Sequence, residues 1–250
     1  TTCEDPKYLK WIHGLKSDGF EIALHNVTFH SSLREDTLKG IDRFNDIFGH
    51  YPKSMANHAD CEESIYWGNY RLTGFNEVLY NIMLLNKHKD IFRGHIVGDK
   101  YFGEDICKKR IKYVRNFVFS NINTLKSCPI MPYHDPLKPY VNYWFASSEG
   151  PSVNTFSRCI SEKNQDQLEY EGGACIMYTH FAKGFYNGNT IDPRFENLMN
   201  RLSKKNGWFV PVSTLLDYLL ENKETNIITN IQRKRLERKW LLHKIRVGTT

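Results

Sequence analysis

Two histidines five residues apart, His25 and His30, follow a short apolar run at residues 22–24 that reads as a buried strand. Neutral imidazole is a good ligand for Zn²⁺ and other borderline divalent ions, and such an ion lowers the pKa of its bound water towards about 7. The pair is therefore a candidate metal site. Its spacing alone is weak support, because the chain contains ten histidines. The surrounding pattern gives the pair its weight.

The same arrangement of a strand that ends at histidine occurs twice more. Residues 53–58 read as a strand that ends at Asn57 and His58, and residues 174–180 as a more apolar strand that ends at His180. Each has a helical pattern before or after it, as connections between parallel strands require. Because the carboxyl ends of parallel strands meet at one end of a sheet, these side chains are predicted to converge. His180 is then placed to protonate a leaving group.

Helical and strand patterns alternate along the rest of the chain, which is typical of an α/β protein. Helices are predicted at residues 6–17, 34–48, 62–72, 75–85, 195–202 and 214–219, the second with a capping box from Ser32 to Glu35 and the last capped by Ser213. Further strand patterns occur at residues 96–97, 114–119, 143–145 and 208–212. Tyr66 belongs to a dense aromatic stretch that packs either in the core or as a wall against a sugar.

Composition indicates one large domain. The 250 residues are 40% hydrophobic and 25% charged, which favours a globular α/β domain over residues 1–222 and a helical tail over residues 223–250. No run approaches the roughly 18 apolar residues of a membrane span.

The chain begins at Thr1 without an initiator Met or a signal-peptide pattern, so we expect an upstream part to have been removed. The compartment cannot be read from this end, and a cytoplasmic or peripheral location is the working expectation. The six cysteines lack CxxC spacing and are expected to be free thiols.

The net charge of +6 is concentrated in the tail. Seven of the 34 Lys and Arg residues and one of the 28 Asp and Glu residues fall between residues 232 and 247, which leaves 27 of each sign elsewhere. A general nucleic-acid binder would carry basic residues across its docking face, so this class is disfavoured. The tail helix either packs on the body with a solvated basic face or contacts an anionic surface or a partner chain.

Three segments together resemble a known family, the polysaccharide deacetylases of the NodB-homology type (carbohydrate esterase family 4). They are GFEIALHNVTFH (residues 19–30), IMYTHFAKGF (176–185) and WFVPVSTLLDYL (208–219), and the resemblance covers most of residues 8–220. It implies a distorted (β/α) barrel, here incomplete, with parallel strands and outer helices. It also implies metal-dependent hydrolysis of a carbon–nitrogen bond other than a peptide bond, releasing acetyl from an amino sugar. His25 and His30 would then bind a divalent ion, most readily Zn²⁺, and His180 would be the catalytic acid.

The sequence departs from the family at three points. The family's histidines are more often four apart, and Asn57, His58 and Asp60 stand where it has an Arg-Pro-Tyr motif. The family's Asp-Asp pair lies on a first strand that this chain does not contain. Either that strand lies upstream, which we expect because its loss would leave unpaired backbone groups, or Asp60 or Asp135 substitutes for it.

Two functional hypotheses follow, together with a simpler reading. The first is a metal-dependent hydrolase that acts on an acetylated carbohydrate, with Asn57, His58, Asp60 and Tyr66 as substrate-binding residues. The second is a carbohydrate-binding module that keeps the fold without the chemistry, which the altered motif and the missing carboxylates favour. The simpler reading is that the histidines are ordinary core or rim residues.

Overall fold

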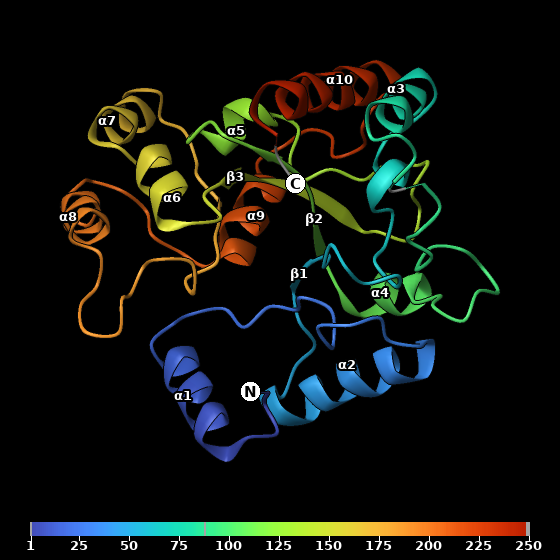
Figure 1. Ribbon diagram of the computed structural model, residues 1–250, viewed down its shortest axis with the longest axis horizontal. Helices are drawn as coiled ribbons and strands as arrows, with labels where there is room; N and C mark the ends of the chain where they lie inside the picture. Colours follow the sequence, from blue (N-terminus) through green and yellow to red (C-terminus); the bar gives the residue numbers. More distant parts are fainter. Residues whose placement is uncertain (1, 88, 249–250) are drawn as a thin grey trace.

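The computed structural model describes residues 2–87 and 89–248, which form an α/β fold around a parallel sheet (Figure 1). Within these residues the sheet has four strands in the order β1 (Ser54–Ala56), β2 (Tyr113–Phe119), β3 (Tyr143–Glu149) and β4 (Met177–Tyr178). Every neighbouring pair is parallel, so the carboxyl ends of the strands lie at one end of the sheet. The sheet is curled like half of a barrel. The predicted parallel α/β architecture is confirmed at this level.

Helices surround the sheet and connect its strands (Figure 1). They are α1 (Pro6–Ser17), α2 (Arg34–Phe48), α3 (Phe75–Met83), α4 (Glu104–Arg110), α5 (Thr124–Ser127), α6 (Val153–Cys159), α7 (Glu162–Tyr170), α8 (Pro193–Leu202), α9 (Val212–Glu221) and α10 (Asn230–Val247), with a 3₁₀ turn at Gly68–Arg71. The helices predicted near residues 6–17, 34–48, 75–85 and 195–202 are therefore confirmed.

The two central strands form where the sequence concentrates bulky apolar residues. In β2, Val114 is fully buried, and in β3 Trp144 is 1% exposed. These two residues lie in register, so their side chains share one face of the sheet. The opposite face carries Arg115, which lies in register with Ala56 on one side and Phe145 on the other. Alternation along β2 therefore places the guanidinium group of Arg115 on the face opposite Val114.

The strand predicted at residues 22–24 is reduced to a single parallel bridge. The backbone of Leu24 donates to Ser54 and accepts from Ala56, which places this one residue beside β1. Asn26, two residues later, has a φ of +53°, a left-handed value that ends the extended segment. The bridge still positions His25 at the carboxyl end of the sheet.

The C-terminal helix α10 packs on the body, as one of the two sequence-based readings predicts. Trp240 and Leu241 are at most 1% exposed, and burial of side chains of this size contributes about 1.5–3 kcal/mol each. Trp240 also faces Tyr80 of α3, with ring centroids 5.8 Å apart. The Glu237 carboxylate accepts hydrogen bonds from Thr73 and Asn76, which fixes the register of the two helices. Helix α10 is thus part of the domain core.

Several local predictions are wrong. Residues 96–97 lie in a bend and a turn, residues 208–211 form no strand, and residues 62–72 form turns and a 3₁₀ helix at Gly68–Arg71 instead of an α-helix. The capping box is also absent, because Leu33 is the N-cap of α2. The backbone amide of the buried Ser32 instead donates a hydrogen bond to the Glu63 carboxylate. Ser213 lies inside α9, where its amide donates to Glu21. All six cysteines, each within the described residues, are free thiols.

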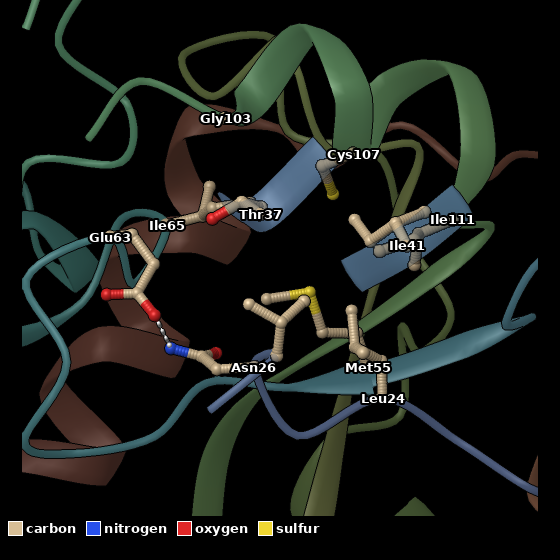
Figure 2. A pocket seen from close by; sticks show the side chains of 11 residues that line it. Leu24, Asn26, Thr37, Ile41, Met55, Glu63, Ile65, Gly103, Cys107 and Ile111 are labelled. Carbon is tan, nitrogen blue, oxygen red and sulfur yellow. Dashed lines mark hydrogen bonds between the residues drawn. The ribbon is translucent and has the colours of Figure 1, made fainter. Parts of the chain in front are cut away.

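A small cavity lies in the core between the sheet and helices α2 and α4 (Figure 2). It measures about 20 Å³, enough for one water, and most of its lining is apolar. At its polar end Asn26 donates to Glu63, while Asn26 Oδ1 and Thr37 Oγ1 have no partner among the described residues. The cavity is too small for a substrate.

Candidate functional site

His25 lies at the carboxyl end of the sheet with one ring nitrogen engaged and the other free. Its Nδ1 is 2.9 Å from the carbonyl oxygen of Ala56, so Nδ1 carries the proton and donates it. The lone pair of Nε2 therefore remains available for a proton or an ion. Desolvation by the surrounding protein lowers the pKa of His25, with smaller contributions from Arg115 and nearby imidazoles. Neutral imidazole is thus the form that this position favours.

His58, at the end of β1, lies directly beside His25. Their ring centroids are 5.0 Å apart. Nδ1 of His58 accepts the backbone N–H of Asp60 at 3.3 Å, which leaves the proton of the neutral ring on Nε2. The buried Asn57 pins the loop, because its amide group bonds both the N–H and the carbonyl of Ile65. Of the substrate-binding residues predicted here, Asn57 therefore holds the loop, and His58 and Asp60 stand at its rim.

His180, two residues past β4, is joined to a tyrosine of that strand. The Tyr178 hydroxyl and Nε2 of His180 are 2.6 Å apart. Desolvation lowers the pKa of His180, and so do Lys183, Arg115 and His58 to a smaller extent. His58 and Arg115 also act on His25, so the imidazoles that end three separate segments lie within electrostatic reach of one another. His25 and His58 are therefore in ring contact, and His180 lies near enough to affect the pKa of His25.

Arg115 is a component of this site that sequence reasoning missed. Its guanidinium carbon lies 4.3 Å from the ring centroid of Tyr178, a cation–π contact. Burial lowers the pKa of Arg115 to about 10, and its Nε has no hydrogen-bond partner among the described residues. The available signal was a single charge within the apolar run YVRNFVF. In a strand, such a charge must be paired, solvated or used.

Two further polar atoms, on the neighbouring strand β3, also lack hydrogen-bond partners among the described residues. Ser147 Oγ and Glu149 Oε2 on β3 are buried, and neither has a hydrogen bond within the described part of the chain. Alternation along β3 puts both side chains on one face, and Glu149 lies in register with Tyr178. Burial raises the pKa of Glu149. Unsatisfied polar atoms are uncommon in folded proteins, and a cluster at the end of a sheet marks a place where water or a ligand belongs.

His30 does not join the other histidines by direct contact. It is exposed, its ring packs on Phe29, and its Nδ1 lies 3.3 Å from the hydroxyl of Thr28. It does line the same open hollow as His25 and His58. This hollow measures about 810 Å³ and is walled by α1, α2 and residues 22–30.

The described residues do not by themselves complete a metal centre. Among residues 2–87 and 89–248, no three His, Cys, Asp or Glu side chains are arranged to hold an ion. His25 offers a free Nε2, whereas His58 Nδ1 is already occupied by the Asp60 amide. Arg115, His58 and His180 each contribute to lowering the pKa of His25. Because Arg115 is a cation, a metal ion at this position would need an added carboxylate to offset its charge.

Two other residues predicted for the site are engaged elsewhere. Tyr66 is 9% exposed and packs against Trp144 and His95, which is the core position that its aromatic stretch allowed. Asp135, one possible substitute for a missing carboxylate, is 2% exposed and paired with Arg233 of α10.

Comparisons of the chain with models of protein families, with curated proteins and with solved structures found no match. In the described part of the chain no helix is both long and apolar enough to cross a bilayer.

Proposed function

We propose that the chain is a hydrolase that removes an acetyl or other acyl group from a carbohydrate, as the resemblance to the polysaccharide deacetylases implies. The observation that supports this is the ring contact of His25 with His58 at the carboxyl end of a parallel sheet, with His180 near enough to affect the pKa of His25. Each comes from a different segment, and ligand sites in such sheets form where strand ends meet. The adjoining hollow of about 810 Å³ is large enough for a small ligand.

His180 is the proposed acid–base residue. Its lowered pKa keeps the ring neutral near pH 7, ready to accept a proton. If Nε2–H donates to the Tyr178 oxygen, Nδ1 keeps its lone pair and takes a proton from water as that water attacks the acyl carbon. The same proton then passes to the leaving nitrogen as the bond to the acyl carbon breaks. Tyr178 holds the imidazole in place throughout.

Arg115 and His58 can donate hydrogen bonds to the negative charge that develops on the acyl oxygen during the reaction. Arg115, with a pKa of about 10, is a cation near neutral pH and has no carboxylate partner in the described part of the chain, and the bond from the Asp60 amide to Nδ1 of His58 leaves Nε2 to carry a proton. Donors of this kind, fixed before the reaction, are an effective means of stabilising an oxyanion. In the deacetylase family that the sequence resembles, a bound divalent ion polarises the acyl group. The donors present here do not complete a site for one, so no step of this mechanism depends on it.

The test is release of acetate from oligomers of N-acetylglucosamine. We expect His180→Ala to lower kcat by at least about 100-fold, because general acid–base catalysis contributes that much or more. The matched control is His13→Ala, an exposed histidine of α1, which should leave kcat unchanged. Equal activity of the two variants, or no acetate release by the unmodified protein, would contradict the proposal. Metal content should be measured on the same samples, and stoichiometric zinc that His25→Ala removes would restore the metal-dependent form of the proposal.

The second candidate is a carbohydrate-binding module without catalysis. The specific observation in its favour is that only bases are prominent in the electrostatic surroundings of His25 and His180, whereas the family chemistry uses a carboxylate pair. Calorimetric titration with the same oligomers distinguishes the two. Binding without acetate release, weakened by Arg115→Met and insensitive to chelator, would establish the module.

A further inference from the structure

Helix α3 exposes a stripe of large apolar side chains. Phe75, Val78, Ile82 and Leu85 are 79%, 53%, 65% and 79% exposed. The spacing of three and four residues places Phe75, Val78 and Ile82 along one side of α3, and Leu85 follows two residues after the helix ends. Tyr80, on the other side of α3, is 1% exposed. Single exposed apolar residues are common, but an aligned row along one helix is the mark of a contact surface.

The neighbouring helix α10 adds positive charge and further apolar side chains to this row. The two helices lie side by side in Figure 1, and Asn76 of α3 donates to the carbonyl of Lys234 and to Glu237 of α10. The outward residues of α10 include the basic Lys234, Arg235, Arg238 and Arg246 and the apolar Ile231, Leu242 and Ile245. The acidic residue of α10, Glu237, is 1% exposed and points inward. The outer side of α10 is therefore basic and apolar together.

We propose that this α3–α10 surface, made of the outward residues named above, docks on the face of an anionic lipid bilayer. Large apolar side chains interleaved with Lys and Arg on exposed helices are what an interfacial membrane contact uses: the rings and aliphatic chains enter the headgroup region while the cations meet lipid phosphates. The absence of exposed acid on α10 removes the repulsion that an anionic surface would otherwise meet.

A peptide or protein groove fits these observations less well. The apolar side chains project outward from two adjacent helices, and the described hollows have no lining residue from α3. A bilayer accepts projecting side chains without a complementary shape, whereas a protein partner requires one. The contact would be peripheral, and it is independent of the hydrolytic proposal because none of its residues belongs to the site.

The experiment is co-sedimentation of the full chain with vesicles of phosphatidylcholine alone and with about 30% phosphatidylserine added. We expect binding to the anionic vesicles to exceed binding to the neutral ones by at least about tenfold and to weaken steeply between about 0.1 and 0.5 M salt. Equal binding to both vesicles, or binding to neither, would overturn the proposal.

Charge variants separate this surface from the overall positive charge. The test variant combines Lys234→Glu, Arg235→Glu and Arg238→Glu, and the control combines Lys7→Glu, Lys163→Glu and Lys204→Glu, which changes net charge equally on exposed residues of α1, α7 and the region after α8. We expect the test variant to lose about 100-fold in vesicle affinity and the control to lose far less, because the field of a membrane falls off within a Debye length. Equal losses would overturn the assignment of the surface.

Variants of the apolar residues test whether the exposed apolar side chains of α3 contribute to vesicle binding. Phe75→Ser with Ile82→Ser should weaken binding to anionic vesicles by at least about tenfold, while the control Tyr170→Ser with Trp208→Ser should bind as the unmodified chain does. Thermal unfolding of each variant verifies that it is folded. If the two α3 changes instead abolish a dimer seen by sedimentation and leave vesicle binding untouched, the occupant is a second copy of the chain and the proposal fails.

Discussion

Two enclosed arginines, Arg233 of α10 and Arg115 of β2, stand in opposite electrostatic settings. Arg233 donates from Nε and from a terminal nitrogen to the Asp135 carboxylate at 3.0 and 2.6 Å, and Lys138 lies 3.7 Å from the same carboxylate. Arg115 has the ring of Tyr178 for a neighbour and an Nε without a partner in the described part of the chain. The paired arginine joins a helix to the core, whereas the unpaired one lies among the histidines at the strand ends.

The difference indicates how to separate structural charge from functional charge in this chain. A buried cation costs free energy unless a partner compensates for it. Where the fold supplies the partner, the group stabilises one arrangement of elements. Where the fold leaves the cation without one, the structure bears a cost that a bound ligand can offset. Arg115 is a case of the second kind.

The largest expected effect comes from breaking the paired arrangement. Asp135→Ala leaves Arg233 and Lys138 buried without their anion, and we expect the free energy of unfolding to fall by about 3–5 kcal/mol. Urea denaturation measures it. The control Asp46→Ala, at an exposed position of α2, should change the unfolding free energy by less than about 0.5 kcal/mol. A loss below about 1 kcal/mol for Asp135→Ala would show that the pair is not structural.

A second prediction concerns His95, whose two ring nitrogens are buried without partners among the described residues. Burial against Tyr66 and Tyr70 lowers the pKa of His95 to about 4. The unfolded chain, with a pKa near 6.5, then binds the proton first as the pH falls. Stability is therefore complete above about pH 6.5 and is lost progressively towards pH 4.

Urea midpoints at neutral and mildly acidic pH check this dependence. His95→Gln should flatten the loss of stability with falling pH, whereas His13→Gln, on the exposed side of α1, should leave it unchanged. His25, whose pKa burial also lowers, contributes in the same direction. A pH dependence that survives unaltered in His95→Gln would contradict the assignment.

The third prediction concerns Arg115, where substitution should not lower the free energy of unfolding as Asp135→Ala does. Arg115→Met removes an unpaired cation and keeps much of the side-chain volume, so we expect stability to be unchanged or higher by about 1 kcal/mol. Acetate release or glycan binding should nevertheless fall at least about tenfold, since a donor to the reacting group is lost. Loss of stability without loss of function would make Arg115 a structural residue like Arg233.

The smallest effect is expected for a pair with the same chemistry at the surface. Arg194 bonds both oxygens of Glu162 at 2.5 and 2.6 Å, but both side chains are about half exposed. Solvent screens such a pair, so Arg194→Ala should change the unfolding free energy by less than about 1 kcal/mol. A cost as large as that of Asp135→Ala would mean that burial does not set the difference between the two pairs.

The sequence by itself determined the parts of the molecule that depend on local pattern. Apolar runs predict β2 and β3, helical periodicity predicts α1, α2 and α8, and the apolar side of the tail predicts the packing of Trp240 and Leu241. Histidines that follow short apolar runs also predict that His25, His58 and His180 converge, and the contact of His25 with His58 agrees with this. Each of these depends on side-chain burial, which appears in the sequence as a periodic pattern of apolar residues.

Tertiary structure decided everything that requires a partner distant in sequence. Residues 208–211 have the composition of a strand and form none, because strand formation requires pairing with a distant segment, which composition does not encode. His58, and not His30, contacts His25, because the Asn57 loop turns its ring that way. The roles of Arg233 and Arg115 differ only because Asp135 reaches one of them. Whether a backbone or side-chain group finds a partner depends on segments that are distant in sequence, so the identity of the residue alone does not predict it.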